Sequence, residues 1–210
     1  MLMSLIIIFI SGLIGFFSFK SNHSNKEKLN VKSELNNSTK EALEEAISHF
    51  PELSDIQIEV EEKNIRTTMA SRPKANFLTR KKEKRVYRLL INNVAGKHNV
   101  PLLDELSYRQ KVGLIGHELS HIVDYMNRSK WDITKLATSY LTKNGKQKTE
   151  HRVDKIAIDH GLGEEVYLYT KFIFEHEEIS NDYKKFKASV YYSPTQLLQL
   201  MPYYNPVMVD

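Results

Sequence analysis

Residues 107–127 read SYRQKVGLIGHELSHIVDYMN, and no other stretch of the chain shows so clear a helical period. Its apolar residues recur at spacings of three and four, as they do on one face of an amphipathic helix. The members of this stripe are Val112, Ile115, Leu119, Ile122 and Met126. The pattern predicts a helix from about Ser107 to Asn127 that lies against the core of a folded domain.

Residues 117–121 within this helix read HELSH. Residues four apart on a helix lie about 40° apart around the axis and roughly 6 Å apart along it, so His117 and His121 can reach one ion. Zinc accepts imidazole nitrogens and keeps a fourth position open for water in catalytic sites. Glu118 is off the ligand positions, where its carboxylate can hold a proton of that water. The pattern predicts a zinc site, against the alternative of a surface helix with two solvated histidines.

Gly113 and Gly116 come just before this motif. A glycine inside a helix costs about 1 kcal/mol relative to alanine, so its presence needs a reason. We expect a neighbouring element or a ligand to approach the helix closely at these positions.

Two histidines and a water leave one protein ligand to find. The chain has no cysteine, so a thiolate is excluded. The segment 148–160 offers four candidates: Glu150, His151, Asp154 and His160. Glu150 and Asp154 share a helix face, whereas His151 points about 100° away from Glu150. A carboxylate one turn after a ligand can accept the free ring N–H of a metal-bound histidine. Glu150 is therefore the expected third ligand, with His151 and then Asp154 as alternatives; without HELSH, an ordinary solvated helix face would be the default.

HELSH, followed after 28 residues by EHRVD at 150–154, resembles the HExxH…ExxxD pattern of the gluzincins. This group of zinc metallopeptidases includes the thermolysin-like peptidases and the small minigluzincins. The resemblance covers about 86–160. It implies that Glu150 is the third Zn²⁺ ligand and that Asp154 orients His117. It also implies an enzyme that hydrolyses a peptide or protein substrate, with Glu118 as the general base.

Two further features follow from the resemblance. Gluzincins place an edge strand before the HExxH helix, where it pairs with an extended substrate, and Arg85–Asn92 stands at that place in the sequence; a plain core strand is the alternative. Many members also have a later Tyr or His that donates to the oxyanion. The candidates here lie in no recognisable motif and stay unassigned: Tyr167, His176, Tyr203 and Tyr204.

The remaining elements predict an α+β fold, and the resemblance implies that this fold is zincin-like. We expect a helix from Ser38 or Thr39 to Phe50, strands over 56–60 and 86–91, and a loop or hairpin over 63–84. Further helices are expected over 132–142, over 148–160 with Gly161 as its end, over 163–179, and from Ser193-Pro194. The expected architecture is a small mixed or antiparallel sheet packed on the HExxH helix, with further helices C-terminal to it.

The chain divides into four expected segments. Residues 1–19 contain no charged side chain and predict a hydrophobic anchor or signal segment. The absence of a basic start favours an uncleaved membrane anchor over an exported protein whose signal is removed. Residues 20–38 predict a flexible polar linker, 39–201 the metallopeptidase domain, and 202–210 a C-terminal tail.

The charges indicate no nucleic-acid partner, because 30 basic and 26 acidic residues are mostly interspersed. The dense run 80–85 is expected to be a solvated loop, and three histidines far from the motif are expected at the surface: His23, His49 and His98. Three rival functions remain. They are a membrane-tethered zincin-fold protein that binds or regulates without turnover, a structural helical domain with a chance motif, and a zinc hydrolase for a non-peptide amide.

Overall fold

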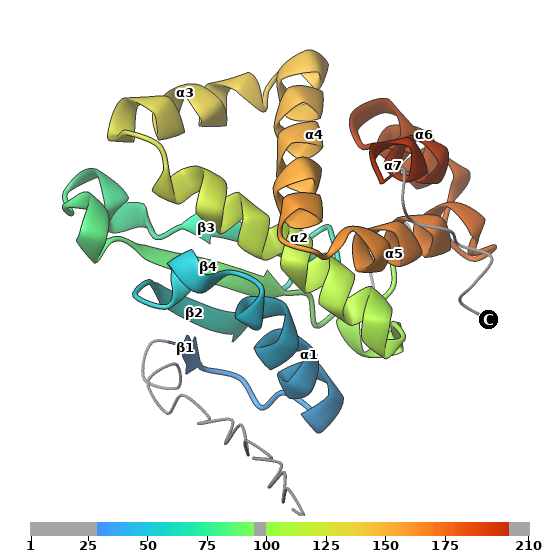
Figure 1. Cartoon of the computed structure of the whole chain (residues 1–210), viewed down its shortest axis with the longest axis horizontal. Helices are drawn as coiled ribbons and strands as arrows, with labels where there is room; N and C mark the ends of the chain where they lie inside the picture. Colours follow the sequence, from blue (N-terminus) through green and yellow to red (C-terminus); the bar gives the residue numbers. More distant parts are fainter. Residues whose placement is uncertain (1–28, 95–99, 202–210) are drawn as a thin grey trace, which may run out of the picture.

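The computed structural model describes residues 29–94 and 100–201, which form an α+β fold around a four-stranded mixed sheet (Figure 1). The strands are β1 (Leu29–Val31), β2 (Gln57–Glu62), β3 (Met69–Pro73) and β4 (Val86–Ile91). Their order is β1-β2-β4-β3; β1, β2 and β4 run parallel, and β3 is antiparallel to β4. The expectation of a small mixed sheet is confirmed.

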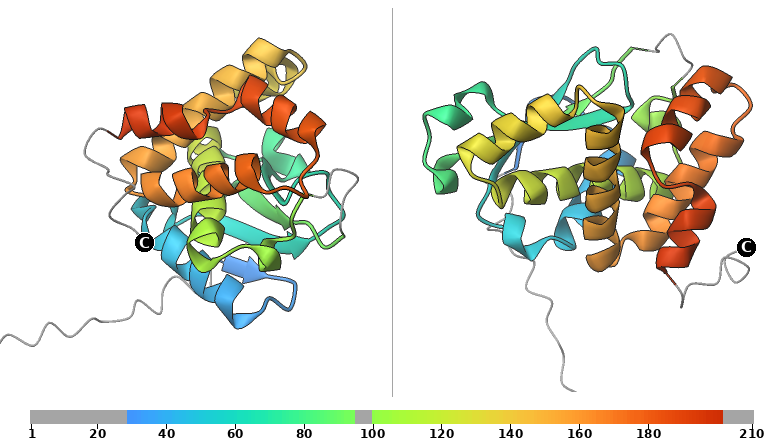
Figure 2. Two further views of the ribbon diagram at one scale, coloured as in Figure 1. Left: turned by 90° about the vertical axis from the view of Figure 1, so that its right-hand side faces the viewer. Right: turned by 90° about the horizontal axis from the view of Figure 1, so that it is seen from above.

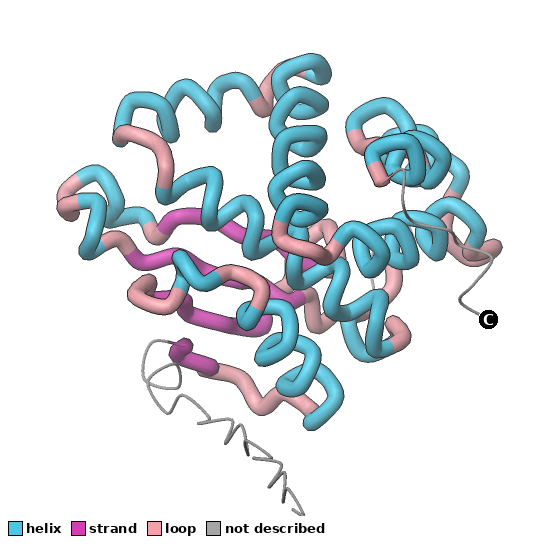
Figure 3. The backbone as a smooth tube through the Cα atoms, viewed as in Figure 1, coloured by secondary structure: helices cyan, strands magenta, loops and turns pink. Residues whose placement is uncertain are grey.

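The helices are α1 (Asn37–Ser48), α2 (Tyr108–Met126), α3 (Lys130–Ser139), α4 (Lys143–Asp159), α5 (Gly163–Glu175), α6 (Asn181–Val190) and α7 (Pro194–Leu200). Helices α1 and α2 lie side by side against the sheet, and α4 crosses α2 at a steep angle (Figures 1 and 2). The tube in Figure 3 shows that the C-terminal part of the described chain is almost entirely helical. This arrangement places α4, α5 and α6 around the middle of α2.

Helix α2 matches its prediction closely. The Ser107 side chain caps its first turn, and the Gln110 side chain accepts from the Ser107 N–H at 3.0 Å, which completes a capping box. Every residue from Lys111 to Tyr125 is buried, so α2 is the central helix of the domain. A helix buried on all sides must place its polar residues in defined interactions or at a site.

The two glycines of α2 mark its contact with α5. A side chain at Gly113 would overlap the backbone carbonyl of Glu165, and one at Gly116 would overlap the end of the Leu162 side chain. Arg109, one turn before Gly113, pairs with both Glu164 and Glu165 at 2.6 Å. The expected close approach of a neighbouring element at these glycines is confirmed, and that element is the start of α5.

Gly113→Ala is expected to destabilise the fold by about 1–3 kcal/mol, as overpacking does, despite the gain of about 1 kcal/mol in helix propensity. Gly116→Ala is the matched comparison, because its new methyl group meets only the flexible end of the Leu162 side chain. Its loss of stability should therefore be smaller. Urea unfolding followed by circular dichroism measures both. A Gly113→Ala protein as stable as the parent would contradict the packing at this contact.

The prediction of an edge strand at Arg85–Asn92 is wrong. β4 lies between β2 and β3, and both of its edges are hydrogen-bonded. Its nearly continuous apolar run and its burial fit a central strand. The edge strand next to α2 is β3, within the segment predicted as a loop or hairpin, and its Pro73 is a residue that sheets tolerate at edges.

Three other expectations change. β1 pairs with β2 within the predicted linker 20–38, so the folded domain begins before residue 39. Helix α1 is capped by Asn36, which accepts from the Thr39 N–H at 2.8 Å. Helix α6 was not predicted at all.

The expected anchor 1–19 and tail 202–210 lie outside the described residues. Within 29–94 and 100–201, no helix combines the length and the apolar character needed to cross a bilayer.

Candidate metal centre

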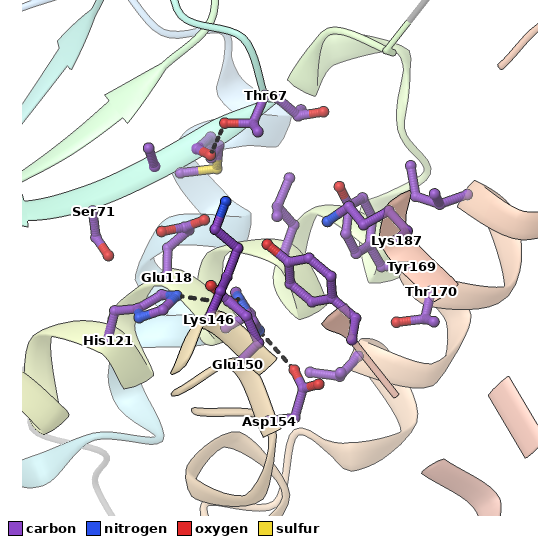
Figure 4. Close-up of a pocket in the computed structure, with 18 of the residues that line it drawn as sticks. Thr67, Ser71, Glu118, His121, Lys146, Glu150, Asp154, Tyr169, Thr170 and Lys187 are labelled. Carbon is purple, nitrogen blue, oxygen red and sulfur yellow. Dashed lines mark hydrogen bonds and ion pairs between the residues drawn. The ribbon is translucent and has the colours of Figure 1, made fainter. Parts of the chain in front are cut away.

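Three predicted ligands converge where α4 crosses α2 (Figure 4). His117 and His121 come from consecutive turns of α2, and Glu150 comes from the first half of α4. All three side chains are buried, and their nearest donor atoms lie within 4.8 Å of one another. Glu150 Oε2 is 3.2 Å from His117 Nε2 and 3.4 Å from His121 Nε2.

The donor atoms fit a bound metal ion. Glu150 Oε2 is buried and has no hydrogen-bond partner within the described part of the chain, although it lies close to both rings. An ion held tetrahedrally at about 2.0–2.2 Å keeps its donor atoms roughly 3.3–3.6 Å apart, which is close to the separations seen here. Two imidazoles and one carboxylate suit a divalent first-row metal without selecting one of them.

Asp154 lies one turn after Glu150 and binds the other side of the His117 ring. His117 Nδ1 donates to Asp154 Oδ1 at 2.7 Å, which leaves Nε2 toward Glu150. Burial lowers the pKa of His117, but the Asp154 hydrogen bond and the negative charges of Asp154 and Glu150 outweigh it and raise that pKa to about 10. Asp154 therefore partners His117 and is not a member of the converging group.

Glu150 stays ionised in this centre. Burial raises the pKa of its carboxyl, but its interactions with His121 and His117 outweigh burial and hold that pKa well below its usual value. Its second oxygen, Oε1, accepts from the Tyr140 hydroxyl at 3.0 Å. Burial and then the charge of Glu150 raise the pKa of Tyr140, so the phenol remains a donor. Tyr140, at the end of α3, thus fixes the orientation of the carboxylate.

An ion cluster around the buried Asp124 clamps α4 onto α2. The Asp124 carboxylate accepts from Arg152 of α4 at 2.8 and 3.1 Å and from Arg128 at 2.9 and 3.1 Å. Burial raises the pKa of Asp124, but the two guanidinium groups outweigh it and lower that pKa. Arg152 is two residues after Glu150, so this cluster sets the position of the carboxylate over the HELSH turn.

The alternative ligands lie elsewhere. The His151 ring stacks on Tyr192 with centroids 3.7 Å apart, outside the converging group. His160 ends α4, and its Nε2 lies 2.8 Å from Glu52 Oε1. His49 is half-buried, with Nδ1 2.8 Å from the His160 carbonyl oxygen, so its prediction as a surface residue is wrong. His23 and His98 lie outside the described residues.

The unassigned oxyanion candidates also lie away from the centre where they can be placed. Tyr167 is buried in a small cluster with Ala157 and Leu197, and the His176 ring packs on Phe172. Neither residue lines the cavity next to the centre. Tyr203 and Tyr204 lie outside the described residues.

A cavity of about 490 Å³ opens beside the converging group. Its walls come from residues 67–72 in and before β3, from α2, from the end of α3, and from α4, α5 and α6. The tyrosines that line it are Tyr125, Tyr140, Tyr169 and Tyr191. Only Tyr125 had a signal in the sequence, because it follows His121 by one helical turn, and the two rings stack 6.1 Å apart.

Glu118 lies at this cavity and outside the converging group. Figure 4 shows its carboxylate on the side of β3, near Ser71, while Glu150 and Asp154 lie on the side of α4. The arrangement can hold a metal ion at the cavity wall with a separate carboxylate beside it. No family model, curated protein or solved structure matches the chain.

Proposed function

We propose that this protein is a zinc-dependent metallopeptidase of the gluzincin type, with a zincin-like fold, that hydrolyses peptide bonds in a peptide or protein substrate. One observation carries the proposal. Glu150 Oε2 faces the Nε2 atoms of both HELSH histidines, while Glu118 stays outside that group and lines the cavity. A site that only holds a metal does not need a carboxylate in that place.

His117, His121 and Glu150 would hold the Zn²⁺. Bound zinc would supply a water of lowered pKa and a Lewis acid for the scissile carbonyl. Glu118 would accept the proton of that water and deliver it to the leaving amine. Asp154 and Tyr140 would keep His117 and Glu150 in the orientation that the structure gives them.

Tyr191 would donate to the developing oxyanion. Its ring lies 5.9 Å from the His117 ring and lines the cavity. Burial and then the charge of Glu150 raise the pKa of Tyr191 well above its ordinary value, so the hydroxyl keeps its proton. A hydrogen-bond donor beside the reacting carbonyl stabilises the charge that develops there.

The edge strand β3 offers a place for an extended substrate. One edge of β3 pairs with β4, and its other edge has no strand partner within the described residues. Residues 67–72 also form one wall of the cavity. Addition of a strand would give main-chain affinity with little demand on the substrate sequence.

The first test is metal analysis of the purified full chain, followed by incubation with a diverse peptide mixture, with and without a chelator. We expect stoichiometric zinc, cleavage that the chelator abolishes, and recovery on adding zinc. No bound metal would indicate a chance motif. Zinc without cleavage would favour the binding or regulatory protein, or hydrolysis of a non-peptide amide if such substrates are turned over. The predicted N-terminal segment would place the enzyme on a membrane, or outside the cell if it is cleaved.

A further inference from the structure

Lys187 of α6 is a buried cation that the proposed reaction does not use. It is 9% exposed and lines the cavity. Its Nζ lies 3.7 Å from the centre of the Tyr191 ring and 5.7 Å from that of Tyr183. Within 29–94 and 100–201, Lys187 makes no ion pair with a carboxylate.

The side chain of Lys187 is buried, but its ammonium group stays accessible from the cavity, where it is partly desolvated and has no counter-ion within the described residues. Partial desolvation of a charge without a counter-ion is unfavourable. Stacking on aromatic faces compensates only part of the lost hydration. Lys185 of the same helix is exposed to solvent, whereas Lys187 is buried against the cavity. Lys187 therefore has the environment of a group that meets an anion from outside the described chain.

The charges around the cavity are separated. Glu118, Glu150 and Asp154 lie toward α2 and α4, and Lys187 lies on the α6 side (Figure 4). Lys146 of α4 also reaches into the cavity, and its Nζ lies 5.1 Å from the centre of the Phe186 ring. An anionic ligand would be drawn toward the α6 side of the cavity.

Tyr191 connects this cation to the metal centre. The centre of its ring lies 3.7 Å from Lys187 Nζ and 5.9 Å from the centre of the His117 ring. The distance from Lys187 Nζ to the centre of the His117 ring therefore cannot exceed the sum of these two distances. An extended peptide advances about 3.3–3.6 Å per residue. A carboxylate within about three residues of the scissile bond can therefore reach Lys187.

We propose that Lys187 binds a carboxylate of the substrate, so that the enzyme prefers peptides with an acidic side chain, or the C-terminal carboxylate, close to the scissile bond. This inference rests on the proposed peptidase function. Lys187 sets specificity and takes no part in proton transfer.

The test uses the zinc-loaded full chain and four peptides with one cleavable core. Each peptide carries Glu or Gln beside the cleaved bond and ends in a free carboxylate or an amide. We expect kcat/KM to be higher for the preferred carboxylate on the order of tenfold, as for one hydrogen bond to a charged group. The Glu-to-Gln ratio reports a side-chain carboxylate, and the free-to-amide ratio reports the C-terminal one.

Lys187→Gln should lose this preference, and Lys187→Arg should keep most of it, because the charge remains. Lys185→Gln is the matched control at an exposed position of α6 and should behave like the parent. If Lys187→Gln does not fold, the Lys187→Glu protein is tested with a peptide that carries lysine in place of the Glu. A preference of this variant for the lysine peptide, together with the carboxylate preference of the parent, then supports the proposal. A parent without preference for either carboxylate, or a preference that survives Lys187→Gln, overturns the proposal.

Binding separates the two proposals. Anisotropy of labelled peptides on Glu118→Gln, and on Glu118→Gln with Lys187→Gln, measures recognition without turnover. If the parent cleaves nothing but binds acidic peptides through Lys187, the peptidase assignment fails and the carboxylate site stands. If the parent cleaves all four peptides equally, the carboxylate site fails and the peptidase assignment stands.

Discussion

Glu118→Gln is expected to keep its zinc and lose nearly all turnover, with a fall in kcat on the order of 10²–10⁴. Glutamine has the shape of glutamate but cannot accept the proton of an attacking water at neutral pH. Glu118 lies outside the converging group of His117, His121 and Glu150, so its carboxylate is not needed to hold a metal. Zinc content and Tm should therefore stay close to those of the parent.

The same substitution at the exposed Glu175 is the matched control and should leave kcat unchanged. Zinc is measured by elemental analysis, and kcat on any peptide that the parent cleaves. A Glu118→Gln protein that retains most of its kcat would remove Glu118 from the mechanism. One that loses its zinc would show that Glu118 supports the metal centre instead.

The parts of the fold that the sequence predicts well have strong local signals. Helix α2 has an uninterrupted apolar period, a Ser107 cap and the HELSH turn, and its observed bounds agree with the prediction almost to the residue. β4 is a nearly continuous apolar run, and Gly161 ends α4 with a φ of 81°, a conformation that favours glycine. The helical spacing of HELSH and of Glu150 with Asp154 likewise indicated which side chains share a face.

What the sequence did not predict depends on tertiary contacts. β1 and β3 are short edge strands of mixed polarity that exist because β2 and β4 pair with them, so periodicity could not find them. The resemblance put the edge strand at β4, and because β3 was not predicted, the sequence did not show that both edges of β4 are paired. Tyr140, Tyr191 and Lys187 reach the cavity from the end of α3 and from α6, and their sequence neighbours carry no mark of it.

Glu150→Ala is expected to reduce zinc affinity more than any other single change outside HELSH. Removing it leaves two imidazoles and takes the negative charge from the centre. Asp154→Asn should cost less, about 10–100-fold in affinity, which is typical for a partner of a metal-bound histidine. Competition with a chromophoric chelator at fixed pH measures both affinities. His151→Ala is the matched control, because His151 follows Glu150 in the sequence but its ring stacks on Tyr192, outside the converging group.

The ranking of these three variants distinguishes the possible ligand sets. Affinity falling in the order His151→Ala, Asp154→Asn, Glu150→Ala fits the geometry, in which Glu150 faces both Nε2 atoms and Asp154 holds His117 Nδ1. A Glu150→Ala protein that binds zinc as tightly as the parent would exclude Glu150 as a ligand and with it the gluzincin assignment. If Asp154→Asn caused the larger loss, Asp154 would have to turn from His117 to the metal. Tyr140→Phe tests the same point, because it removes the hydroxyl that donates to Glu150. This change should weaken zinc binding only if Glu150 is a zinc ligand that Tyr140 orients.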